Sequence, residues 1–319
     1  MDRSRLPFFR ISRGKLSGDF IFEALVGFFS LGIIILAFLL FRELFIGSQL
    51  SRDTFGVDFL TGSTWDPVNE IFGALPFIFG TLVSSFLALL IAVPFSIGIA
   101  IFLSELAPEK LRMPLSFIIE LLAAIPSVII GLWGIFILAP FIRDYLAPPF
   151  LTYLGFLPLF QGPMYGPSML TGGVILALMI IPITSSVCRE VIMTVPTHQR
   201  EGALALGATG WEVTWIAVLP YARSGIFGAV ILGFGRAIGE TMAVTMVIGN
   251  SPRISASLFS PSYTMASVIA NELLEATSKL YISSLIEIGF LLLVVSVIIN
   301  IAARILVWKL LKVEAGEVA

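Results

Sequence analysis

Residues 71–104 read IFGALPFIFGTLVSSFLALLIAVPFSIGIAIFLS and contain no charged side chain, although Glu70 and Glu105 stand directly on either side. A helix needs about 20 mostly apolar residues to cross the hydrocarbon core of a bilayer. This interval exceeds that length, and its only prolines are Pro76 and Pro94. The stretch therefore predicts a membrane-spanning helix, and with it an α-helical membrane fold.

The composition of the whole chain agrees with a membrane protein. Of its 319 residues, 57% are hydrophobic and 13% are charged, whereas soluble domains contain about 25% charged residues. The net charge of −2 argues against nucleic-acid binding. One cysteine, Cys188, and one histidine, His198, can form neither a disulfide framework nor a cysteine- or histidine-rich metal site. We expect an integral membrane protein without a metal site.

Six intervals are long and apolar enough to cross a membrane, although Arg236, Glu240 and Glu287 lie within the last two. The basic N-terminus precedes an apolar stretch that is longer than the core of a signal peptide, so we expect a retained anchor helix there. The prolines and glycines of residues 148–167 predict a loop between the third and fourth spans. The predicted spans are residues 24–41, 71–104, 120–143, 169–188, 224–249 and 281–308.

Lysine and arginine residues in short loops mark the cytoplasmic side of membrane proteins. Here 13 of the 19 basic residues fall in the N-terminal segment, the 110–112 loop, the 189–223 loop and the C-terminal tail, and only 4 fall in the alternate loops. Six spans place both termini on one side. The charge bias therefore predicts a multi-pass protein of the cell inner or plasma membrane with cytoplasmic termini.

The loop between the fourth and fifth predicted spans differs from the other loops. Residues 189–210 read REVIMTVPTHQREGALALGATG, and residues 211–220 continue as WEVTWIAVLP. Thr197, after Pro196, suits the N-cap of a helix, and Gly207 and Gly210 suit its end. We expect a short cytoplasmic helix between these breakers, in a position to contact another protein.

This loop resembles the membrane subunits of binding-protein-dependent ABC importers. Their pattern is Glu-Ala-Ala, three residues, Gly, nine residues, Ile, one residue, Leu-Pro; here Gly202 replaces the first Ala and Ala217 stands in place of Ile. The resemblance implies a coupling helix that rests in a cleft of a cytoplasmic ATPase. The ATPase-coupling residues that it implies are Glu201, Gly202, Ala203, Gly207, Leu219 and Pro220.

The sequence offers no P-loop for ATP. That motif requires Gly-Lys-Ser or Gly-Lys-Thr, and the one lysine preceded by glycine, Lys15, is followed by Leu16. We therefore expect a transport subunit that is not an enzyme and holds no cofactor itself. ATP and Mg²⁺ would be bound by ATPase subunits on separate chains.

Two opposite charges lie inside the fifth predicted span. Arg236 lies about 12 residues beyond Ser224, which is roughly 18 Å and so near the bilayer midplane, and Glu240 follows four residues later on the same helix face. A charge at that depth costs about 2.5–3.5 kcal/mol, so it usually pairs or functions. One interpretation is a self-neutralising ion pair. The other is an arginine that contacts an anion, because its fork matches phosphate-like oxygens.

Residues 236–245, residues 125–134 and the Trp65-Asp-Pro sequence are similar to PstC-type permeases of phosphate ABC importers. The resemblance covers the second to sixth spans and implies inward transport of inorganic phosphate. It also implies a heterodimer with a PstA-type permease, two PstB-type ATPase subunits and an external PstS-type phosphate-binding protein, all without nucleic acid. The residues expected along the substrate path are Arg236, Glu240, Thr241 and Asn250.

Alternatives to phosphate import stay open at this point. The chemistry of Arg236 does not choose phosphate over sulfate, molybdate or another oxyanion. An ion-coupled secondary carrier is usually built from repeats, and none is found here. A membrane-embedded hydrolase would need a nucleophile–base set or a metal motif such as His-Glu-x-x-His, which the sequence lacks.

The resemblance and the spans together predict an all-α, polytopic importer-type permease. Its predicted parts are a cytoplasmic segment (1–19), an anchor helix (20–46), an outer loop (47–73), a permease core (74–308) with five spans and the coupling loop 189–223, and a cytoplasmic tail (309–319).

Overall fold

The computed structural model describes residues 18–317. Predictions for residues 1–17 and 318–319, which include most of the segment 1–19, lie outside the described residues. The chain divides into two units, residues 1–47 and 48–319.

The first unit contains one helix, α1 (Gly18–Gly47). This helix includes the predicted span 24–41 and extends beyond it at both ends. Its apolar side chains are exposed, among them Phe22, Ile33 and Phe38. Exposed apolar surface over such a length suits lipid rather than water. The helix coincides with the predicted anchor 20–46, whose anchoring role stays a prediction.

Within residues 18–317, six helical segments are long and apolar enough to cross a membrane, and this confirms the predicted number. Their hydropathy comes from uncharged runs that only a bilayer or a large core can accommodate. The segments are Ile21–Gly47, Leu75–Leu106, Ser127–Leu154, Met169–Met193, Gly210–Gly239 and Lys279–Ile305.

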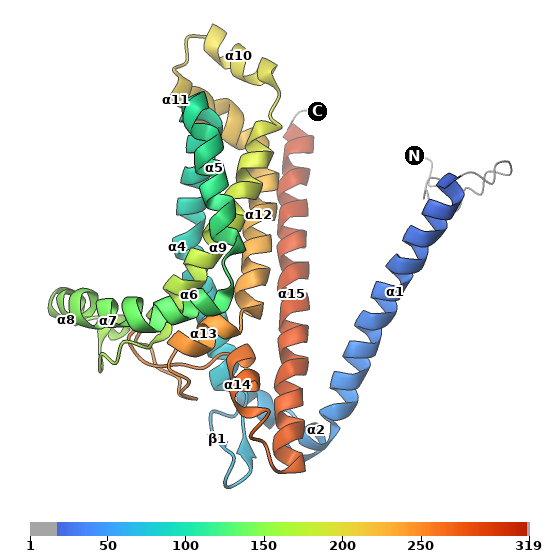
Figure 1. Ribbon diagram of the computed structural model, residues 1–319, viewed down its shortest axis with the longest axis vertical. Coiled ribbons are helices and arrows are strands. Elements are labelled where there is room, and N and C mark those ends of the chain that lie inside the picture. Colours follow the sequence, from blue (N-terminus) through green and yellow to red (C-terminus); the bar gives the residue numbers. More distant parts are fainter. Residues whose placement is uncertain (1–17, 318–319) are drawn as a thin grey trace. The chain divides into compact units, whose positions relative to one another are not determined.

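Long helices of the second unit run lengthwise beside one another (Figure 1). The lengthwise helices are α4 (Leu75–Ile101), α9 (Met169–Met193), α12 (Leu219–Gly239) and α15 (Lys279–Glu317). Helix α9 lies in the centre and packs against α4 and α12. The contacts use small and branched side chains such as Ala88, Ile180 and Ala237, which allow close approach. One end of this unit carries α10 (Thr197–Ala205) and is called the α10 end; the opposite end is called the hairpin end.

The third span differs from its prediction. Residues 120–143 do not form one helix, because α5 (Glu109–Ala124) ends at Ile125, whose ψ of 127° is extended. A residue before proline avoids the helical region, and Pro126 follows. Figure 1 shows the next segment running across the long axis of α9. It contains α6 (Ser127–Trp133), π-helical turns η2 (Gly134–Leu138) and η3 (Ile142–Leu146), and α7 (Ala139–Phe141) between them.

The predicted loop at 148–167 is partly wrong, because its first half is helical. Helix α8 (Ala147–Leu154) includes Pro148 and Pro149 in its first turn. The amides of the first turn have no partner inside a helix, so proline costs nothing there. A single 3₁₀ turn, η4 (Pro158–Phe160), follows.

The hairpin end is built around Trp65. Strands β1 (Trp65–Asp66) and β2 (Ile71–Phe72) pair antiparallel, and the ring centroids of Trp65 and Phe72 lie 4.8 Å apart. Trp65 Nε1 donates to Glu272 Oε2 at 2.8 Å, and the Tyr281 hydroxyl donates to the same oxygen at 2.6 Å. Residues 48–73, which make up nearly all of the predicted outer loop 47–73, are therefore folded onto the bundle. Its helices are α2 (Gln49–Phe55) and α3 (Asp58–Thr61), and α14 (Met265–Glu272) supplies Glu272.

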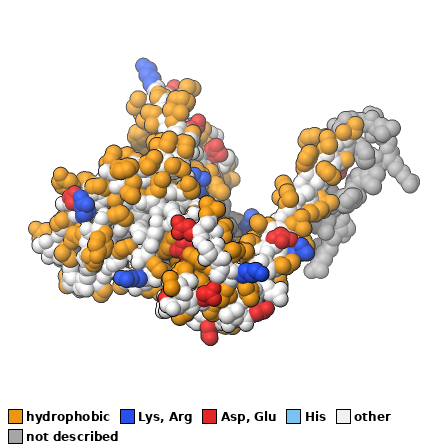
Figure 2. Space-filling model, turned by 60° about the horizontal axis from the view of Figure 1, so that its bottom comes forward, with side chains coloured by type: hydrophobic (Ala, Val, Ile, Leu, Met, Phe, Trp, Pro, Cys, Tyr) orange, Lys and Arg blue, Asp and Glu red, His pale blue; other side chains and the backbone are white. Residues whose placement is uncertain are grey.

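The surface agrees with a membrane location. Figure 2 shows apolar side chains over much of the visible face, with charged side chains gathered mainly toward the hairpin end. At that end, hydrogen bonds from Asn69 lower the pKa of the Asp66 carboxyl. Charge concentrated at helix ends, with apolar sides between, is the pattern expected of a bilayer-spanning bundle.

Two glycines of α4 are expected to respond oppositely to alanine. A Cβ on Gly80 would lie 2.1 Å from the backbone oxygen of Tyr263, whereas one on Gly98 would meet nothing within 4 Å. We expect Gly80→Ala to lower the free energy of unfolding by about 1–3 kcal/mol through overpacking. Gly98→Ala should leave it unchanged or raise it by up to about 1 kcal/mol. Thermal unfolding of both purified variants is the measurement, and equal melting temperatures would contradict this packing.

Candidate functional site

The short helix predicted after Pro196 exists as α10. It begins at Thr197, and the residue before it, Pro196, has the extended ψ of 141° and no side-chain cap. The prediction of Thr197 as N-cap is therefore wrong by one residue. Pro196 directs the chain into the helix by its fixed φ, and its carbonyl accepts from Gln199 N at 3.1 Å.

Helix α10 ends at a glycine, as predicted. Gly207 has a φ of +90°, the amide of Ala208 donates to Ala203 O at 3.2 Å, and the amide of Gly207 donates to Leu204 O at 2.9 Å. This pair of bonds is a Schellman motif, which satisfies the last carbonyls of a helix. Gly210 does not stop α10. It begins α11 (Gly210–Val213), because Thr209 and Glu212 form a capping box there.

The end of α10 supplies a prediction with a matched control. A residue with a side chain is destabilised by about 1–2 kcal/mol in the left-handed region. We therefore expect Gly207→Ala to destabilise the C-terminal end of α10. Gly202 lies inside the helix, and a Cβ placed on it would meet nothing within 4 Å. Gly202→Ala should therefore stabilise α10 by up to about 1 kcal/mol. Hydrogen exchange of the α10 amides measures both. Faster exchange in Gly202→Ala than in Gly207→Ala would contradict the described geometry.

Two of the six coupling residues implied by the pattern pack against one apolar cluster. Ala203 of α10 and Leu219 of α12 both pack against the cluster that contains Ile192 and Val218. The π-helical turn η5 (Thr214–Val218) brings Leu219 back toward α10. The pattern therefore describes a packing unit, in which α10 rests on the ends of the spans. Among its other residues, the structure exposes Glu201, Gly202, Gly207 and Pro220.

The outward face of α10 and its terminal turn is apolar at two positions. Leu204 is 51% exposed and Leu206 is 91% exposed. These leucines lie at the end of the bundle, next to polar Gln199 and Glu201, which are also exposed. Two exposed leucines at the end of the bundle offer apolar surface that another protein can cover.

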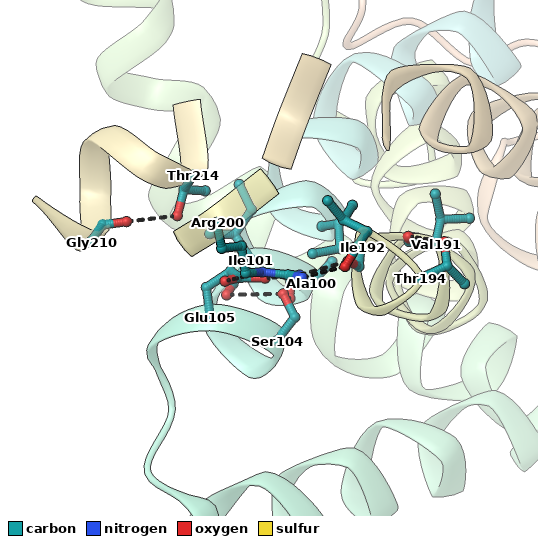
Figure 3. A network of polar contacts seen from close by, with 11 residues as sticks. Ala100, Ile101, Ser104, Glu105, Val191, Ile192, Thr194, Arg200, Gly210 and Thr214 are labelled. Carbon is teal, nitrogen blue, oxygen red and sulfur yellow. Dashed lines mark hydrogen bonds and ion pairs between the residues drawn. The ribbon is translucent and has the colours of Figure 1, made fainter. Parts of the chain in front are cut away.

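Arg200 holds α10 in place through a cluster that sequence analysis missed (Figure 3). Its Nη2 lies 2.8 Å from Glu105 Oε1, and its Nε donates to Glu105 Oε2 at 3.3 Å. It also donates to the backbone oxygens of Val195 and Ile192. Glu105 belongs to the π-helical turn η1 (Phe102–Leu106), which continues α4. In the sequence Glu105 only marked the end of an uncharged interval, and its partner lies 95 residues away.

Arg236 lies in the last turn of α12 and is exposed. In the described part of the chain it makes no ion pair or side-chain hydrogen bond. Figure 1 shows that α12 ends part-way along α15, so this turn lies within the length of the bundle. The face of α12 that contains Ala229, Gly233 and Ala237 is buried. Arg236, seven residues after Ala229, lies at the edge of this buried face and is exposed there, while Gly228, Gly235 and Gly239, where a Cβ would meet nothing, lie on the exposed side of the helix.

The prediction that Arg236 and Glu240 share one helix face is wrong, and the interpretation of the two as an ion pair loses its geometric basis. The helix ends at Gly239, and Glu240 has an extended ψ of 124°, so the four-residue spacing no longer places the two side chains together. No ion pair joins them in residues 18–317. Instead Glu240 Oε1 accepts from Ala243 N at 3.4 Å, at the start of α13 (Met242–Val247). Glu240 therefore caps the next helix.

Thr241 and Asn250 flank α13 at its two ends. Thr241 O accepts from the Thr245 hydroxyl at 2.7 Å. Asn250 has a φ of +47°, and its Nδ2 donates to Thr245 O at 2.8 Å, which closes the turn after α13. Glu240 and Thr241 thus adjoin Arg236, whereas Asn250 is separated from them by the length of α13, about 9 Å at 1.5 Å per residue.

Comparison with known proteins gives consistent results. Residues 93–312 match the family described as "Binding-protein-dependent transport system inner membrane component". The phosphate transport system permease protein PstC of Mesorhizobium japonicum is 49% identical over 86% of this chain and 84% of its own length. PstC of Pasteurella multocida is 46% identical over 94% of both chains.

The fold is also similar to a solved importer. A chain of a bacterial ABC transporter that imports the acidic polysaccharide alginate superposes with a TM-score of 0.60 at 19% identity, over 92% of this chain and 98% of that one. The family match runs from within α4 into α15 and includes α10 and Arg236. This chain is a multi-pass membrane protein that belongs to the binding-protein-dependent transport system inner membrane components and, within them, to the PstC phosphate permeases.

Proposed function

We propose that this chain is a membrane-spanning subunit of an ATP-driven importer that moves inorganic phosphate inward from an external binding protein. The observation that carries the proposal is the match, over most of both chains, to permeases named for phosphate transport. Helix α10 is compatible with the proposal, because Leu204 and Leu206 offer apolar surface to a partner at the end of the bundle.

The α10 end is proposed to face the cytoplasm. The bias of basic residues toward the loops at 110–112 and 189–223 supports this orientation, and it places both termini inside. Two PstB-type ATPase subunits would then bind ATP and Mg²⁺, and one of them would receive α10 with Leu204 and Leu206. The hairpin end would face the external PstS-type phosphate-binding protein.

The substrate path is proposed to run along the exposed face of α12. A phosphate ion cannot enter hydrocarbon without a large desolvation cost, so it needs a polar route with a positive charge. Arg236 supplies that charge within the length of the bundle, and the glycines around it leave room for a second wall. A PstA-type permease, packed against this face, would supply the other half of the route. Glu240 and Thr241 adjoin the arginine, and Asn250 lies at the far end of α13.

Transport follows from alternating access. Closure of the ATPase subunits around ATP would move α10, and α10 rests on the cluster that joins the ends of α4, α9 and α12. Rocking of these helices would open the path to one side at a time. Arg236 contributes a planar fork of donors to the phosphate oxygens, whose binding must be weak enough to permit release.

The choice of anion is tested by competition. The complex is reconstituted with its binding protein, and uptake of labelled phosphate is measured with a hundredfold excess of sulfate or molybdate. We expect excess unlabelled phosphate to reduce the uptake, and sulfate and molybdate to leave it unchanged. Hydrogen-bonding groups held in fixed positions distinguish protonated from unprotonated oxyanions. Full competition by sulfate or molybdate, with weak competition by phosphate, would assign the permease to another oxyanion.

A further inference from the structure

Arg200 joins three elements through one side chain (Figure 3). It projects from α10, forms a two-pronged ion pair with Glu105 in η1, and donates to the backbone oxygens of Ile192 and Val195. Ile192 lies in the last turn of α9, and Val195 lies in the connection between α9 and α10. One guanidinium therefore ties α10 to the ends of both α4 and α9.

The ion pair lies in a largely dry place. The side chains of Arg200 and Glu105 are only 21% and 15% exposed. Screening by water and salt is weaker there than at an exposed pair, and a two-pronged arginine–carboxylate contact also fixes direction. The positive charge additionally suits the negative end of the α9 dipole.

The other contacts of α10 are of a different kind. Ala203 packs by its small apolar side chain against the cluster of Ile192 and Val218, and the chain continues through α11 and η5 into α12. Apolar packing transmits a push but gives little resistance to sliding or pulling, because it is non-directional. The bonds of Arg200 are directional, so they are suited to transmit movement in either direction.

We infer that Arg200 and Glu105 are positioning residues that make α10, α9 and α4 move as one body when the ATPase moves α10. The inference rests on the proposed function and adds a role for two residues that touch neither substrate nor nucleotide. Covalent routes carry the movement to α9, through residues 194–196, and to α12, through α11 and η5, whereas the ion pair is the directional contact that carries it to α4. Without the pair, α10 would move with its ATPase while α4 lags behind.

The test measures phosphate transported per ATP hydrolysed by the full complex in proteoliposomes. Glu105→Gln keeps the shape of the side chain and removes its charge. We expect it to keep ATPase binding and hydrolysis and to lower the transport ratio about tenfold, the change that one lost charged hydrogen bond produces. Glu109→Gln, an exposed residue four positions later, is the matched control and should keep the wild-type ratio.

A double-mutant cycle separates the pair from general damage. In the Arg200→Gln background, adding Glu105→Gln should lower the ratio no further, because the interaction is already gone. Independently of substrate, Glu105→Gln should speed hydrogen exchange of the α10 amides, and Glu109→Gln should not.

Each outcome decides the inference. A wild-type ratio in Glu105→Gln, with unchanged exchange, would overturn it. Loss of ATPase binding in Glu105→Gln would also overturn it, since the pair would then hold the docking surface and not the connection to the spans. A wild-type complex that transports no phosphate at all contradicts the proposed function instead, so the two failures are distinguishable.

Discussion

Replacing Arg236 by glutamine is expected to reduce phosphate uptake by the assembled complex at least tenfold while the complex still assembles. The guanidinium is exposed at the edge of the buried face of α12 and has no ion pair or side-chain hydrogen bond within residues 18–317, so its removal breaks no internal contact. Hydrogen bonds from a charged group contribute about 1.5–3 kcal/mol each, and 1.4 kcal/mol corresponds to a factor of 10. Uptake of labelled phosphate into proteoliposomes is the measurement.

Two further variants sharpen this expectation. Arg236→Lys keeps the charge but loses the planar fork, so its uptake should fall between wild type and Arg236→Gln. Arg253→Gln removes an exposed arginine from the segment after α13 and serves as the control with normal uptake. Uptake by Arg236→Gln at the wild-type rate would remove this arginine from the substrate path.

The double substitution Leu204→Asp and Leu206→Asp is expected to release the ATPase from the permease. Burying a leucine contributes about 1.5–3 kcal/mol, and an aspartate in its place adds the cost of covering a charge. Together the two changes should weaken binding by at least about a hundredfold. Co-purification of the PstB-type subunit with the membrane chain measures the effect.

Leu274→Asp provides the control at the opposite end of the bundle. Leu274 is 94% exposed, follows α14, and carries the same change in charge and shape. This variant should retain the ATPase in full. If the α10 variant also retained it, then α10 would not be the docking surface.

The sequence predicts those features that depend on local composition. The apolar intervals predict six spans, and residues 18–317 contain six helical segments long and apolar enough to cross a membrane. Pro196 and Gly207 predict the bounds of α10 to within a residue, because proline and glycine act on the backbone where they stand. The pattern of Glu201, Ala203 and Leu219 predicts a coupling helix, and the structure packs Ala203 and Leu219 against one cluster and exposes Glu201, while the coupling role stays a prediction.

Other features depend on contacts between distant residues or on competing local signals. Absence of charge shows that residues 120–143 are apolar but not that the chain turns at Ile125. The four-residue spacing of Arg236 and Glu240 places them on one face only while the helix continues. The local signals for the end of the helix are Gly239 and, two positions later, the β-branched Thr241. The pairing of Arg200 with Glu105 has no local signal, since it arises only when α10 folds back onto α4.

The most direct test of the central claim is whether phosphate accumulates at the expense of ATP on the α10 side. The complex is reconstituted with ATP enclosed in the vesicles, where α10 and the ATPase subunits are proposed to lie, and with the phosphate-loaded binding protein outside. The account predicts accumulation that requires the enclosed ATP and continues after ionophores dissipate proton and sodium gradients. Accumulation without ATP, abolished by those ionophores, would contradict it and identify an ion-coupled carrier.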